Sequence, residues 1–137
     1  LAQFKGIEIT PDVIIYGYED SLNENRYLEK NYSDCSEVFW MIGCSGQGDG
    51  WFINKLDGSI FFYDHDSGEY QINYFMNLGI NFIEFLQLSF LYCELERYLD
   101  LNDGIVDEIR QKQFEDTVNS IHDDLFSSYP YRKKRCV

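Results

Sequence analysis

Residue types that could do chemistry are concentrated in one short stretch of the chain, residues 46–68. This stretch holds five glycines, four aspartates and His65 around two short apolar runs. Four kinds of structure use such residues: a phosphate loop, a calcium loop, an acid–base catalytic cluster, and two strands joined by acidic turns. The spacing of the residues distinguishes these possibilities.

A phosphate loop is disfavoured by both spacing and charge. The glycines at 46, 48 and 50 lack the spacing of the dinucleotide-binding fingerprint, and no G-K-[ST] occurs. The residues that follow have the pattern of a strand, whereas a phosphate site needs the N-terminus of a helix. Asp49 would also repel the ligand, so this interpretation is rejected.

A calcium loop of the EF-hand type fails on its spacing. Such a loop needs glycine at position 6 and a bidentate glutamate at position 12. With Asp64 as position 1, position 6 is Glu69 and position 12 is Phe75. An adventitious weak site stays open, but the sequence predicts no metal and no cofactor.

Acid–base catalysis is the third possibility, because Asp64, His65 and Asp66 carry suitable groups. At the end of a strand, however, alternate side chains point to opposite sides, so we expect His65 to diverge from its two neighbours. The second histidine, His122, falls at the edge of an acidic helical segment and is expected to be solvated. We therefore predict no catalytic residues, and keep a small hydrolase using Asp64 and Asp66 as an alternative.

The remaining interpretation is structural. Asp57-Gly58 is a strong signal for a two-residue hairpin turn between strands at 51–56 and 60–63. A second turn is expected at 66–68. Further strands are predicted at 4–18, interrupted by a turn at Pro11-Asp12, and at 38–42 and 70–75. The capping-box spacing of Ser21 and Glu24 predicts a short helix over about 22–31.

Helical spacing replaces the strand pattern after residue 77. Apolar residues keep this spacing over 80–99, and Asn102-Asp103-Gly104 is expected to end the helix. A second helix is predicted over 105–126; its apolar stripe consists of Ile105, Ile109, Val118, Ile121 and Leu125. The predicted fold is therefore α+β, a single domain over 1–131 with a mainly antiparallel sheet of about four to six strands, helices packed on it and two C-terminal helices. A basic tail, 132–137, follows.

The charge of the chain is strongly negative. Its 137 residues include 24 acidic and 11 basic residues, for a net charge of −13. Such a charge disfavours direct nucleic-acid binding and attracts a basic partner, although it could serve solubility alone. The four cysteines form no C-x-x-C pair, which is typical of a reducing cytoplasm. The most apolar run, 80–95, is too short and too acidic for a membrane span, and a start at Leu1 is consistent with a fragment.

Four segments, in this order, resemble the SUKH superfamily of Smi/Knr-type domains: IGCSGQGDGWF at 42–52, DGSI at 57–60, YDHD at 63–66 and NFIEFL at 81–86. The resemblance covers about residues 38–88 and consists of order and hydrophobic type. One departure is clear, because family members usually begin with a helix that this chain lacks before Phe4.

The resemblance implies a binding protein rather than an enzyme. It implies an immunity protein of a bacterial polymorphic toxin system, which acts in the cytoplasm and neutralises a cognate, basic, nuclease-type toxin by direct contact. A non-catalytic regulatory or scaffold domain, as in fungal relatives, is the alternative. By position, the partner-binding candidates are Asp49, Trp51, Asp57, Asp64, His65, Asp66 and Glu69.

Overall fold

The chain forms two compact units, Leu1–Phe82 and Ile83–Val137, called here the sheet unit and the helical unit. The computed structural model describes residues 5–132 of them. Among these described residues, all strands belong to the first unit, and the second is built of helices. This arrangement confirms the predicted α+β class.

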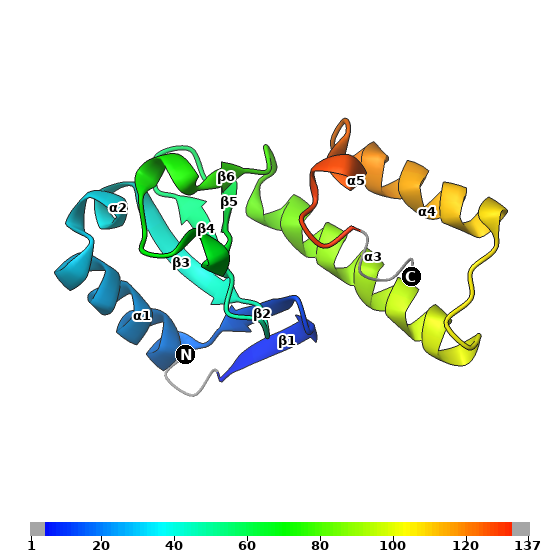
Figure 1. Ribbon diagram of the computed structural model, residues 1–137, viewed down its shortest axis with the longest axis horizontal. Helices are drawn as coiled ribbons and strands as arrows, with labels where there is room; N and C mark the ends of the chain where they lie inside the picture. The colour runs from blue at the N-terminus through cyan, green and yellow to red at the C-terminus, as the bar shows by residue number, and fades with distance from the viewer. Residues whose placement is uncertain (1–4, 133–137) are drawn as a thin grey trace. The chain divides into compact units, whose positions relative to one another are not determined.

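A six-stranded antiparallel sheet forms the centre of the sheet unit, and its strands lie side by side in chain order (Figure 1). The strands are β1 (Gly6–Thr10), β2 (Val13–Tyr16), β3 (Phe39–Cys44), β4 (Gly50–Asn54), β5 (Ile60–Tyr63) and β6 (Met76–Asn77). Every neighbouring pair is antiparallel. The predicted sheet type and strand number are thus confirmed.

Two helices connect β2 to β3: α1 (Tyr18–Asn31) and α2 (Ser33–Val38). The predicted capping box at Ser21 is wrong, because α1 begins earlier and Gly17 is its N-cap. The Ser21 N–H donates to the Gly17 carbonyl at 2.9 Å, so Ser21 lies inside the first turns. Glu19 and Asp20 occupy the first turn, where negative charge favours the helix dipole. Helix α2 was not predicted.

The buried side chain of Asn25 joins α1 to β3 through hydrogen bonds. Strand β2 pairs with β3 only at Gly43 and Cys44, so the first half of β3 lacks a strand on that side. The Asn25 amide donates to the Met41 carbonyl at 2.9 Å, and its oxygen accepts from the Met41 N–H at 2.7 Å. Asn25 thereby supplies both backbone partners that a longer β2 would have provided.

The core of the sheet unit is rich in aromatic residues. Its buried cluster consists of Leu28, Cys35, Phe39, Met41, Phe52, Tyr63 and Phe75. The rings of Phe39 and Phe75 stack with centroids 4.1 Å apart. Phe75 belongs to the segment 70–75, and the prediction of a strand there is wrong. That segment instead contains a 3-10 helix, η2 (Ile72–Tyr74), and the chain rejoins the sheet only at β6.

The β4–β5 hairpin exists, but its turn is wider than predicted. Asn54 N–H donates to the Ser59 carbonyl, and the Gly58 N–H donates to the Asn54 carbonyl. Four residues, 55–58, therefore lie between the last paired positions, and β4 ends at Asn54 rather than at residue 56. The prediction of a two-residue turn at Asp57-Gly58 is thus wrong, although Gly58 does adopt a positive φ of 76° within the wider turn.

The helical unit contains α3 (Phe82–Leu101), α4 (Glu108–Ile121) and α5 (Leu125–Ser128), with α3 starting one residue before the boundary between the units. The predicted break after α3 is confirmed, because the Gly104 N–H caps the Leu99 carbonyl at 2.7 Å. The second predicted helix is shorter than expected. It starts after Asp107, whose side chain accepts from the Arg110 N–H, and ends before an extended residue, His122. In the described part of the chain, no helix is both long and apolar enough to cross a membrane.

Aromatic packing also organises the helical unit. The Tyr92 ring lies 4.9 Å from that of Phe114 and 4.7 Å from that of Tyr129. Two residues of the predicted stripe, Val118 and Leu125, are fully buried. The prediction is wrong for the N-terminal half of the stripe, because Ile105 and Ile109 are exposed. The predicted basic tail, apart from Arg132, lies outside the described residues.

Candidate functional site

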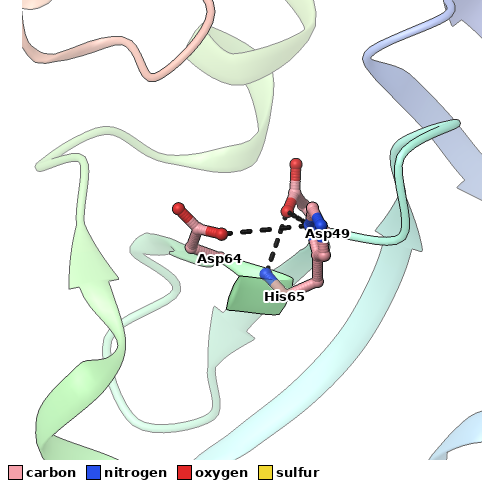
Figure 2. Close-up of side chains that lie close together, drawn as sticks. All are labelled: Asp49, Asp64 and His65. Carbon is pink, nitrogen blue, oxygen red and sulfur yellow. Dashed lines mark hydrogen bonds and ion pairs between the residues drawn. The ribbon is translucent and has the colours of Figure 1, made fainter. Parts of the chain in front are cut away.

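The acidic residues on either side of the β4–β5 hairpin meet in space (Figure 2). Asp49 immediately precedes β4, and Asp64 immediately follows β5. Gly50 and Tyr63 are directly paired in the sheet, so Asp49 before β4 and Asp64 after β5 are also brought close. The hairpin register therefore creates the cluster.

Asp49 is the buried centre of this cluster. Its side chain is 4% exposed, and its carbonyl accepts from the Ser45 N–H at 2.9 Å, which closes the β3–β4 loop. Ser45 Oγ donates to Asp49 Oδ2 at 3.2 Å and accepts from the Asp49 N–H at 3.1 Å. Asp49 Oδ1 accepts from the His65 N–H at 2.9 Å and lies 2.5 Å from His65 Nδ1. One carboxylate thus ties the β3–β4 loop to the segment after β5.

The imidazole of His65 lies among three carboxylates. Besides Asp49, Asp64 Oδ1 is 3.9 Å from Nδ1, and Asp66 Oδ1 is 3.2 Å from Nε2. The hydrogen bond to Asp49 is the main cause that raises the pKa of His65; partial burial opposes it, and the charges of Asp49, Asp66 and Asp64 add to it. The cluster therefore favours the protonated, cationic ring.

The prediction that His65 diverges from its neighbours is wrong. It assumed an extended chain, whereas His65–Ser67 form a 3-10 helix, η1. Asp64 Oδ1 caps this turn by accepting from the Asp66 N–H at 2.8 Å. The helical turn brings both flanking carboxylates to the ring. Asp49, the main partner of the ring, was not predicted to pair with His65. Pairing the two strands of the predicted hairpin would have brought the residue before the first strand close to those after the second.

The other predicted partner-binding residues do not join the cluster. Asp57 lies at the opposite end of the β4–β5 hairpin, where hydrogen bonds from the Ser59 N–H and hydroxyl lower its pKa. Trp51 is fully buried, and its indole N–H donates to the Asp12 carbonyl at 2.9 Å. It is therefore a core residue, although by position it was among the partner-binding candidates.

Glu69 is exposed beside the cluster and borders a shallow pocket of about 280 Å³. We call this the tyrosine pocket; its side chains come from Tyr27, Tyr32, Tyr63, Tyr70, His65 and Glu69. A second pocket, of about 460 Å³, shares Tyr32 and Tyr70 with it. Neither pocket was predicted from the sequence.

Asp49, Asp64 and His65 also offer one metal-ligand atom each within 4.8 Å of one another. The short contact between His65 Nδ1 and Asp49 Oδ1, 2.5 Å, fits a hydrogen-bonded ion pair. Two ligands of one zinc ion, each at about 2 Å from it, would be separated by about 3 Å. The geometry is that of a charge pair between two loops, and it does not require an ion.

No family model, curated protein or solved structure matches this chain.

Proposed function

We propose that the chain is a non-catalytic binding protein of the SUKH type, an immunity protein that neutralises a basic protein toxin in the cytoplasm by direct contact. One observation carries the proposal: within the described residues, no lysine or arginine compensates the exposed acids around the β4–β5 hairpin. If the charge served solubility alone, acids without a lysine or arginine partner would not be expected to gather at particular loops.

The charge distribution of the sheet unit supports this proposal. Residues 1–82 include 13 acidic and 4 basic residues, for a net charge of −9. Four exposed acids lie in or beside the hairpin, and we call them the hairpin acids: Asp57 in its turn, and Asp64, Asp66 and Glu69 after β5. In residues 5–132, no lysine or arginine forms an ion pair with any of them. Asp64 and Asp66 share the charge of one histidine, His65, with Asp49, so this group of residues keeps a net negative charge that a partner's cations can neutralise.

Exposed apolar side chains of the sheet unit could supply the anchoring contacts that Trp51 does not. Tyr27 exposes 54% of its surface and Tyr74 48%. Ile72 and Met76 are also exposed, on the chain between η1 and the end of β6. Aromatic residues and methionine are enriched in protein interfaces, where they contribute more affinity than rim charges do.

A nuclease toxin is a fitting partner on physical grounds. Its substrate is a phosphate backbone, so its binding surface must carry lysine and arginine. An acidic inhibitor is attracted to that surface and can block it. Complementary charge also raises the association rate, which matters when the toxin is already inside the cell.

The test is capture of the partner. The tagged chain is co-expressed with its gene neighbours, or exposed to lysate of its source organism, and bound proteins are identified by mass spectrometry at low and moderate salt. A variant of the hairpin acids, D57N/D64N/D66N/E69Q, is compared with a variant of exposed acids in the helical unit, D100N/D103N/E108Q/D123N, which changes the charge equally.

We expect one basic protein in near-equal amount with the wild type and the helical-unit variant, and a strong reduction with the hairpin variant. Equal losses with both variants would show only a general charge effect. Capture of signalling or cell-wall proteins instead would favour the regulatory alternative.

A small hydrolase is the second candidate, because the buried carboxylate of Asp49 orients His65 as an acid–base pair requires. In the structure, however, the other ring nitrogen faces Asp66 at 3.2 Å, so Asp66 would have to move for proton transfer to a substrate. Replacing Asp64 and Asp66 by asparagine separates the candidates. A hydrolase would lose turnover on ester or phosphodiester substrates and keep its fold, whereas a binding protein would show a graded loss of affinity.

A further inference from the structure

We infer that the tyrosine pocket receives an arginine side chain of the basic partner, with Glu69 as the counter-ion. This inference rests on the proposed function, because it specifies how one cation of that partner is recognised.

The pocket is built largely of aromatic rings. Tyr70 contacts two other rings of the pocket edge-to-face, with its ring 5.2 Å from that of Tyr32 and 4.8 Å from that of Tyr63. The ring of Tyr27 lies 6.2 Å from that of Tyr32. The volume of about 280 Å³ is at the small end for ligand sites and suits one long side chain.

The wall of the pocket is held in place by the core beneath it. Tyr63 is buried, and its hydroxyl donates to the Glu69 carbonyl at 2.6 Å while accepting from the Gln71 N–H at 3.2 Å. Tyr63 and Tyr70 both pack on Phe75 of the buried cluster. A preformed wall loses little conformational entropy when a side chain enters.

The electrostatic environment favours a cation. Burial, and next the negative charge of Glu69, raise the pKa of Tyr32. Burial, followed by the charge of Glu24, raises the pKa of Tyr70 to about 12. Both phenols therefore remain neutral at physiological pH, in a negative potential. The positive charge of His65, also at this pocket, is balanced by Asp49 and Asp66.

Arginine fits these features better than other side chains do. The guanidinium plane stacks on tyrosine rings and pairs with a carboxylate through two parallel hydrogen bonds. Lysine offers a compact, strongly hydrated charge that makes less use of the rings. An anionic group would be repelled by Glu69.

The experiment uses hexa-arginine, hexa-lysine and hexa-citrulline peptides as probes, followed by NMR of backbone amides and tyrosine rings at low salt. The pocket variants are Tyr27→Leu and Glu69→Gln, and the matched controls are Tyr18→Leu and Glu37→Gln, which lie outside the tyrosine pocket and the hairpin acids. All four positions are exposed, so each variant is expected to fold.

We expect hexa-arginine to shift the signals of Tyr27, Tyr32 and Tyr70, and to bind more tightly than hexa-lysine. Hexa-citrulline should cause no comparable shift. Each pocket variant should weaken hexa-arginine binding about threefold or more, as expected for loss of one cation–π or ion-pair contact, and the controls should not.

Equal weakening by Glu37→Gln and Glu69→Gln, or equal affinity for lysine and arginine peptides, would overturn the inference. Shifts restricted to the acidic loops, with unchanged tyrosine signals, would also overturn it while leaving a basic partner in place. Failure of the proposed function itself is recognised separately, by the absence of any basic protein in the capture experiment.

Discussion

At the scale of single residues, His65 connects segments that are distant in the sequence. Its ring and its backbone N–H both bind Asp49, 16 positions earlier, and this contact fixes the loops at one end of the β4–β5 hairpin. The loop after β5 also carries Asp64 and Asp66. The charge state of one histidine therefore influences how the exposed acids are presented.

The contribution of His65 to stability should depend on pH. Its folded-state pKa is raised above the ordinary value of 6.5, so its stabilising effect is complete below 6.5 and is lost as pH rises through the raised value. We expect urea unfolding to show a larger stability difference between wild type and His65→Gln at pH 5.5 than at pH 9. Ser67→Ala, in the same 3-10 helix, is the control. A difference that does not change with pH would contradict the described pairing.

Asn25 is expected to be the most sensitive polar residue of the sheet unit. Replacement by leucine removes both partners of the Met41 backbone and leaves a buried N–H and carbonyl unsatisfied. We expect a loss of about 2–4 kcal/mol in the free energy of unfolding. Asn23→Leu, exposed on the same helix, should change stability by less than about 0.5 kcal/mol. Chemical denaturation measures both, and similar effects would show that Asn25 has no special role.

At the scale of elements, the segment between β5 and η2 shapes the acidic surface. Gly68 ends η1 with φ 80° and ψ −142°, a region that side-chain-bearing residues rarely adopt. A methyl group added there would meet no atom within 4 Å, so its cost is conformational alone. A substitution at Gly68 therefore tests the backbone conformation of this turn without disturbing side-chain packing.

Gly68→Ala should therefore destabilise the protein by about 1–3 kcal/mol, although the residue is exposed and makes no side-chain contact. Ser67→Ala, its neighbour, should be close to neutral. Thermal or urea unfolding checks this. If Gly68→Ala is as stable as the wild type, the turn does not have the described geometry.

Elements with strong local patterns could be predicted from the sequence. The bounds of β5 were predicted correctly, as were the turn at Pro11-Asp12 and the long helix α3 with its glycine break. Elements decided by tertiary contacts could not. Phe75 has strand propensity but is drawn into the aromatic core after a 3-10 turn, and the stretch before β3 forms α2.

The candidate site could be predicted only in part. Its acids and His65 were identified by type, and Asp64, His65, Asp66 and Glu69 do lie near one another. The link to buried Asp49 depends on the strand register, and the tyrosine pocket joins residues from α1 and from the segment after β5. Neither relation is visible in local spacing. The sequence left Trp51 open between core and interface because amphipathic aromatic residues are common in both, and the structure places it in the core.

At the scale of the whole molecule, the net charge of −13 should act mainly on association. Exposed charges are screened beyond about 8 Å at physiological ionic strength, whereas packed apolar anchors are not. We expect raising salt from 50 to 500 mM to slow association with the partner by about tenfold or more and to change dissociation much less. Stopped-flow or surface-binding kinetics measure the two rates. Association that is insensitive to salt would exclude electrostatic steering.

The central claim, neutralisation of a basic toxin through the hairpin acids, is tested most directly by growth of a host that expresses the captured partner. Wild-type chain and the helical-unit control D100N/D103N/E108Q/D123N should restore growth. The variant D57N/D64N/D66N/E69Q should fold, as checked by circular dichroism, and should protect poorly. A partner that does not impair growth, or full protection by the hairpin variant, would contradict the account.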